Sequence, residues 1–251
     1  GFTGADLENL LNESAILAVR NGIKAITMEE IEESIAKVSM GPEKRSRILT
    51  DEDKKHTSYH EGGHALATYF CKTQDKVHEI SIIPRGNAGG YTLSLPEKDE
   101  SYMFKNKMSE RIIVLLGGMA AEKLIFNDVS TGASSDLQRA TSIARSMVTR
   151  YGMSDVLGPV VYDSGDDEIF IGRDMGHVKN YSETTASKID EEVNKIITDC
   201  FSAAEKILSD NIEKLHEVAN FLIENEKMNE EQFYNMMDGN PSEDINKLQE
   251  D

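Results

Sequence analysis

The stretch TSYHEGGHALATYF, residues 57–70, decides how the rest of this sequence is interpreted. Its composition predicts a helix over residues 52–71, yet Gly62 and Gly63 stand inside that helix, between two histidines. Each interior glycine costs a helix about 1 kcal/mol relative to alanine. Two glycines in succession are therefore expected where another backbone must pass close to the helix.

A second predicted helix, over residues 106–125, offers a matching surface. Its sequence includes GGMAA, in which four small residues lie close together: Gly117, Gly118, Ala120 and Ala121. We expect the small faces of these two helices to pack tightly against each other.

Residues 60–64 form the pattern H-E-x-x-H. Because residues i and i+4 lie on one face of a helix, His60 and His64 can both reach one metal ion, and zinc accepts neutral imidazole nitrogen. Glu61 is offset from that pair, where it can take a proton from an attacking water and return it to a leaving amine. The pattern arises by chance on the order of once in a hundred such chains, so two unrelated histidines on a helix are the alternative.

A catalytic zinc needs a third protein ligand, and two carboxylates are candidates. Glu122 lies in the predicted helix with the small face, where it could equally be a buried supporting residue. Asp136 follows the loop NDVSTGASSD at the start of a helix, where an acidic residue is also favoured by the helix dipole. The residues alone favour neither.

Composition bounds the class of protein. With 39% hydrophobic and 29% charged residues, a soluble globular core is expected. The net charge of -18 argues against a nucleic-acid partner, because phosphates would not be neutralised. Cys71 and Cys200 stand far apart without a C-x-x-C pattern, which favours a reduced compartment and argues against a disulfide framework. No apolar run approaches the ~20 residues that span a bilayer.

The pattern along the chain predicts a mainly α fold with a minor sheet. Residues 1–41 form a small helical unit, with capping-box pairs at Thr3 and Asp6 and at Thr27 and Glu30. Residues 42–50 are polar and predict a linker. Residues 51–238 form the second domain, and the polar segment 239–251 is expected to be a disordered tail.

Within the second domain, VHEISIIP and GGYTLSLP are strand candidates joined by a turn-like RGNAGG. Helices are expected over 136–150, over 182–226 with a break near Ser209 and Asp210, and over roughly 229–237. Residues 151–176 lack sustained periodicity and are expected to be irregular, with short strands.

Several motifs occur in the order typical of one family. They are GFTGADLENLLNESAILAVR, GPEKRS, HEGGHA, SIIPRGNAGGYT, GGMAAEKLIF, STGASSDLQRAT, ARSMVTRYGMSDVLGPV and ETTASKIDEEV. Over roughly residues 1–235 the chain resembles the C-terminal part of the FtsH family, the membrane-anchored, ATP-dependent AAA+ zinc metalloproteases. The resemblance implies a helical FtsH-type peptidase domain with a small β-sheet near the active site. It also implies that a short helical remnant of the AAA+ lid precedes this domain.

The resemblance also implies residue roles. The family's third zinc ligand matches Asp136, so Zn2+ would be held by His60, His64 and Asp136, with Glu61 as the catalytic residue and Glu122 in support. The segment HEISIIPRGNAGGYT resembles the strand region beside the active site, where an edge strand could hold an extended substrate by main-chain pairing.

Partners and location follow from the same resemblance. The expected activity is endoproteolysis of unfolded or membrane proteins in protein quality control, by a homo-hexamer or a hetero-hexamer with paralogues. The sequence holds no G-x-x-x-x-G-K-[ST] loop, so ATP and Mg2+ are expected in the parent protein only. The chain starts without Met, as a soluble piece of a longer protein would. That parent would be anchored in a bacterial inner membrane, or in a mitochondrial or plastid membrane.

Two other classes of function are compatible with the sequence. A ring-forming helical module could dock client proteins without cutting them. A zinc site with a closed fourth coordination position would be structural rather than catalytic.

Overall fold

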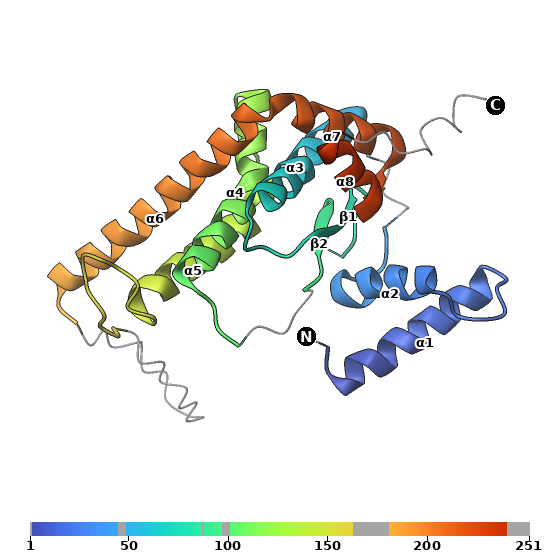
Figure 1. Ribbon diagram of the computed structural model, residues 1–251, viewed down its shortest axis with the longest axis horizontal. Coiled ribbons are helices and arrows are strands. Elements are labelled where there is room, and N and C mark those ends of the chain that lie inside the picture. Colours follow the sequence, from blue (N-terminus) through green and yellow to red (C-terminus); the bar gives the residue numbers. More distant parts are fainter. Residues whose placement is uncertain (1, 45–48, 87, 97–100, 163–180, 240–251) are drawn as a thin grey trace. The chain divides into compact units, whose positions relative to one another are not determined.

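The computed structural model describes residues 2–44, 49–86, 88–96, 101–162 and 181–239 (Figure 1). Parts of the predicted linker, of the irregular segment and almost all of the predicted tail lie outside these ranges. The described chain is mainly helical with one small antiparallel sheet, so the predicted fold class is confirmed. It divides into two compact units, one formed by 1–61, 77–94 and 218–251, the other by 62–76 and 95–217.

The first unit opens with helices α1, Gly4–Arg20, and α2, Met28–Met40. Both predicted capping boxes are confirmed. The main-chain N–H of Thr3 donates to the Asp6 carboxylate at 2.8 Å, and the N–H of Thr27 donates to the Glu30 carboxylate at 3.0 Å. These local side chains satisfy N–H groups at each helix start and fix where the helix begins.

The sheet has the strand order β2-β1-β3. Strands β1, Val77–Ser81, and β2, Tyr91–Ser94, lie within the two predicted strand segments and pair antiparallel. Strand β3, Lys227–Asn229, was not predicted, because three residues are too few for a periodic pattern. It becomes a strand by pairing with β1 across a long separation in sequence, and it leads directly into α8, Glu230–Asp238.

A buried arginine connects α2 and the segment after it to this sheet. The Arg85 side chain is 1% exposed and forms ion pairs with Glu33 at 2.6 Å and Glu43 at 2.8 Å. Lys227 of β3 pairs with the same two glutamates, and the Arg85 guanidinium lies 5.5 Å from the centre of the Tyr91 ring. A buried charge is tolerated only when it is paired, so removing either glutamate should destabilise this part of the first unit.

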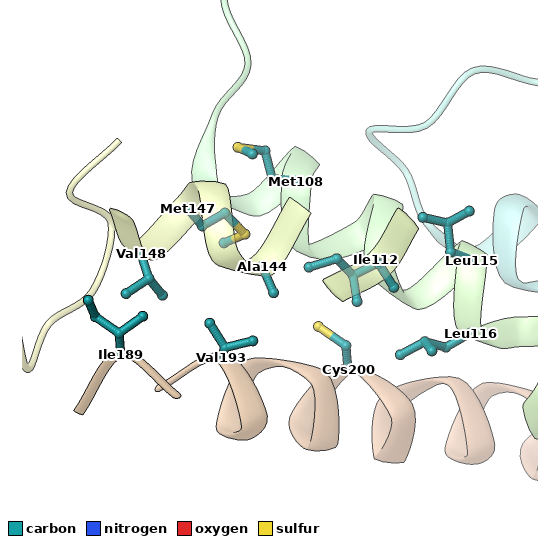
Figure 2. Packing of buried hydrophobic residues seen from close by; sticks show 11 residues of the cluster. Met108, Ile112, Leu115, Leu116, Ala144, Met147, Val148, Ile189, Val193 and Cys200 are labelled. Carbon is teal, nitrogen blue, oxygen red and sulfur yellow. The ribbon is translucent and has the colours of Figure 1, made fainter. Parts of the chain in front are cut away.

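In the second unit, three long helices enclose a cluster of buried hydrophobic residues. They are α4, Lys105–Phe126; α5, Ser134–Thr149; and α6, Glu183–Asp210, and a short 3-10 turn, η1, Thr131–Ala133, leads into α5. Figure 2 shows Ile112 and Leu116 of α4, Ala144 and Met147 of α5, and Val193 of α6 converging. Their burial supplies the non-directional hydrophobic stabilisation that holds these helices together.

Two further helices run through both units. Helix α3, Asp51–Phe70, coincides with the predicted helix to within one residue at each end, and its first eleven residues belong to the first unit. Helix α7, Ile212–Asn225, follows α6 after the break predicted near Ser209 and Asp210. Both helices are continuous, so the position of each residue along them is set by helix geometry.

The two cysteines, Cys71 and Cys200, are buried and free. Burial raises the pKa of the Cys71 thiol to about 12 and that of the Cys200 thiol to about 11.

Since the thiolate is the reactive form, we expect alkylation of either thiol at pH 8 to be at least about 100-fold slower than that of free cysteine. Thiol titration in buffer and in denaturant checks this, and rapid reaction of both thiols in buffer would contradict it.

Candidate metal centre

The two histidines of the H-E-x-x-H pattern lie one turn apart on α3. His64 is 8% exposed and Glu61 is 6% exposed, whereas His60 is half-buried. Among the described residues, one group of side chains could hold a metal ion, and it consists of His60, His64 and Asp136. One ligand atom from each lies within 4.8 Å of the others. The structure thus brings together the three residues that the resemblance implied.

The His64 ring shows which nitrogen faces the site. Its Nδ1 lies 2.7 Å from the main-chain oxygen of Val114 in α4, so Nδ1 carries the proton and donates it there. Its Nε2 then presents a lone pair to Oδ2 of Asp136 at 3.5 Å. The ring nitrogen and the carboxylate oxygen are both lone-pair donors of the kind that ligate a metal ion.

This geometry fits zinc. Two ligand atoms bound to a tetrahedral zinc at about 2.0–2.1 Å are about 3.3–3.4 Å apart, close to the separation of His64 Nε2 and Asp136 Oδ2. Two imidazoles and one carboxylate are a common zinc donor set, and three protein ligands leave a fourth position open. Within the part of the chain that the structure describes, the donor set thus has the ligand number of a catalytic zinc site.

The two carboxylates that the residues alone could not separate have different surroundings. Asp136 lies in the first turn of α5, beside His64. Glu122 is fully buried in α4, and its carboxylate accepts hydrogen bonds from the Ser130 N–H at 2.6 Å and the Ser130 hydroxyl at 3.1 Å. It does not belong to the metal-capable group. Glu122 thus holds the loop that leads through η1 to Asp136.

Glu61 has a partner that the sequence did not indicate. The Thr92 hydroxyl in β2 lies 2.9 Å from the Glu61 carboxylate. Val114 and Ser130 were missed in the same way, because each acts through a main-chain atom or a common hydroxyl and leaves no motif. Only the fold brings Thr92 and Val114 beside the H-E-x-x-H helix, and Ser130 beside Glu122 of α4.

The close approach expected at the glycines is confirmed for Gly63. A Cβ on Gly63 would lie 2.4 Å from the Gly117 carbonyl oxygen and 2.7 Å from the Ala121 Cβ. A Cβ on Gly117 would in turn lie 2.6 Å from the Gly63 carbonyl oxygen. Helices α3 and α4 therefore meet backbone to backbone one residue before His64, and the same approach brings the Val114 carbonyl to the His64 ring.

Two histidines a helical turn apart, a glutamate between them and a carboxylate from another helix are the arrangement of an H-E-x-x-H metallopeptidase. Comparison with known proteins agrees: the model of peptidase family M41 matches residues 47–236, and that of the AAA+ lid domain matches residues 1–33. The chain belongs to peptidase family M41, the family of the FtsH ATP-dependent zinc metalloproteases.

Its relatives include proteins named ATP-dependent zinc metalloprotease FtsH. The chain is 54% identical over 249 residues to FtsH 1 of Thermoanaerobacter sp. (strain X514), covering 99% of the chain and 40% of that protein. It is 56% identical over 233 residues to FtsH of Caldicellulosiruptor bescii, covering 93% and 38%. Against FtsH of Thermotoga maritima the identity is 46% over 227 residues, covering 90% and 37%. The chain thus spans about two fifths of the length of these curated relatives.

None of the helices in the described ranges combines the length and the apolar character needed to cross a bilayer.

Proposed function

We propose that this chain is the peptidase part of an ATP-dependent zinc endopeptidase that hydrolyses peptide bonds of unfolded or membrane proteins in protein quality control. The observation that carries the proposal is the convergence of His60, His64 and Asp136 beside Glu61. Membership of family M41 and the names of the relatives support it.

His60 and His64 would hold the zinc through ring nitrogens, and Asp136 through a carboxylate oxygen. When bound, zinc supplies a Lewis acid that polarises the scissile carbonyl and makes the attacking water more acidic. Glu61 follows His60 directly on α3 and accepts a proton from that water. It then returns the proton to the amine that leaves when the peptide bond breaks. Val114 keeps the His64 ring in the orientation that binding requires.

Strand β2 provides a place for substrate. It pairs with β1 on one side and is an edge strand of the described sheet. An extended chain can add to such an edge through main-chain hydrogen bonds that depend little on its side chains. This mode of binding suits a protease that acts on unfolded segments of many sequences.

ATP hydrolysis, ring assembly and membrane anchoring are proposed for the full-length protein. The AAA+ lid match at residues 1–33 supports a neighbouring ATPase module that uses ATP and Mg2+, and the sequence itself carries no P-loop. We propose assembly as a homo-hexamer or as a hetero-hexamer with paralogues. Anchoring would be through a segment outside this chain, in a bacterial inner membrane or in a mitochondrial or plastid membrane.

Metal content and cleavage test the proposal together. The full-length protein supplied with ATP should bind about one catalytic zinc per chain and should degrade casein. Removing the zinc with a chelator should abolish degradation, and adding zinc back should restore it. Degradation that persists after complete loss of zinc would rule out the proposed chemistry. A metal-loaded protein that binds casein without cutting it would indicate a docking module instead.

The choice of third ligand has its own test. Asp136→Asn should weaken zinc binding by at least about 10-fold, because a charged oxygen donor is lost from the metal. Glu122→Gln should retain zinc, because Glu122 contacts the Ser130 loop rather than the histidines. Zinc titration of the two purified variants distinguishes them. If only the Glu122 variant loses the metal, the assignment of Asp136 is wrong.

A further inference from the structure

We propose that Thr92 is a positioning residue that holds the Glu61 carboxylate in the orientation needed for proton transfer. The inference rests on the proposed function, and it gives a residue of strand β2 a role in positioning Glu61. The Thr92 hydroxyl oxygen lies 2.9 Å from a carboxylate oxygen of Glu61 and 3.1 Å from the main-chain oxygen of the same residue. The hydroxyl thus contacts both the side chain and the backbone of Glu61.

The other end of the Glu61 side chain is confined by a glycine. A Cβ on Gly90 would lie 3.1 Å from the Glu61 Cγ, and only 2.7 Å from the Thr57 Cγ2 and from the Ser81 carbonyl oxygen. Gly90 lies in the bend directly before β2, and Thr92 lies within that strand. Gly90 packs against the Glu61 Cγ, and the Thr92 hydroxyl donates a hydrogen bond to the Glu61 carboxylate.

The hydroxyl is itself fixed by the sheet. Thr92 is paired in register with Ile80 of the central strand β1, and Ile80 is paired on its other side with Met228 of β3. Ile80 and Met228 are both fully buried. Thr92 therefore lies on a strand that is hydrogen-bonded to a buried neighbouring strand. A residue that orients another side chain needs such a rigid support.

Orientation matters because Glu61 is 6% exposed and has several rotatable bonds. Proton transfer requires the carboxylate within hydrogen-bond reach of the proton it accepts. Loss of the Thr92 hydroxyl removes one of the contacts that restrict the carboxylate, which lowers the fraction of molecules poised for reaction. Substrate binding along the strand edge does not require this hydroxyl, so the turnover number should change and KM should not.

The experiment uses the full-length protein supplied with ATP and a flexible fluorogenic peptide. Thr92→Val removes the hydroxyl and keeps the branched shape, whereas Thr92→Ser keeps the hydroxyl. We expect kcat to fall about 10-fold in Thr92→Val, with KM and zinc content within about 2-fold of wild type. Thr92→Ser should recover most of the lost kcat. Wild-type kcat in Thr92→Val, or an equal loss in Thr92→Ser, would overturn the inference.

A double-mutant cycle separates positioning from a purely structural role. In a Glu61→Gln background, adding Thr92→Val should change the residual rate by less than about 2-fold, because its effect acts through the Glu61 carboxylate. If the two losses multiply instead, Thr92 acts independently of Glu61 and the inference fails. If Glu61→Gln itself leaves cleavage intact, the proposed function fails together with it.

A substitution at Gly90 tests the packing of this segment against the Glu61 side chain. Gly90→Ala should lower kcat by forcing the start of β2 away from α3, because its Cβ would lie 2.7 Å from the Thr57 Cγ2 and 3.1 Å from the Glu61 Cγ. Gly89→Ala is the matched control: Gly89 is exposed, and a Cβ there meets no atom within 4 Å. Equal activity of the two alanine variants, with both folded, would count against the confinement of Glu61 by this strand.

Discussion

Glu61→Gln should reduce cleavage of an unfolded protein by roughly 10²- to 10⁴-fold and leave zinc bound. Glutamine keeps the shape of the side chain and an oxygen that can accept the Thr92 hydroxyl, so the local packing around Glu61 is preserved. It lacks a group that can take up a proton at neutral pH. The metal should remain, because the proposed ligands are His60, His64 and Asp136 and each is unchanged.

Three measurements on the full-length protein check this prediction: casein degradation, zinc per chain and the rate of ATP hydrolysis. Only degradation should fall. Glu52→Gln is a matched control, since Glu52 lies on the same helix but is exposed in its first turn, and this variant should behave as wild type. Degradation near the wild-type rate in Glu61→Gln would mean that another group performs the proton transfer.

Replacing Gly63 should have the largest effect on stability. An alanine in the middle of a helix normally gains about 1 kcal/mol over glycine. At this position the added Cβ would lie 2.4 Å from a carbonyl oxygen of α4, and main-chain atoms cannot move aside as the end of a flexible side chain can. Overpacking of this kind costs about 1–3 kcal/mol or more, so the clash reverses the usual gain.

We therefore expect Gly63→Ala to lower the melting temperature by about 5–10 °C, and Gly63→Leu to abolish folding or zinc binding. Gly4→Ala provides the comparison, because Gly4 begins α1 and a Cβ there meets nothing within 4 Å. Calorimetry and zinc titration of the three variants give the answer. A stable, zinc-binding Gly63→Leu variant would show that α3 and α4 do not need their close approach.

Features encoded by neighbouring residues were predictable from the sequence. The starts of α1 and α2 follow from capping pairs three residues apart, and α3 follows from composition over its own length. Two members of the metal-capable group, His60 and His64, were predictable because helix geometry alone puts positions i and i+4 on one face. The glycine pair also signalled a close neighbour, and GGMAA pointed to its partner in α4.

Tertiary structure was needed wherever a residue acts through a neighbour distant in sequence. No periodic pattern marks β3, which exists because β1 offers it main-chain partners. Glu122 and Asp136 both carry a carboxylate that could bind a metal. Their roles differ because the Glu122 carboxylate accepts a hydrogen bond from Ser130, whereas the Asp136 carboxylate lies beside the His64 ring. The contact of Thr92 with Glu61 depends likewise on how a strand approaches α3. Local sequence determines helix phase and capping, whereas the pairing of distant residues depends on the packing of the whole chain.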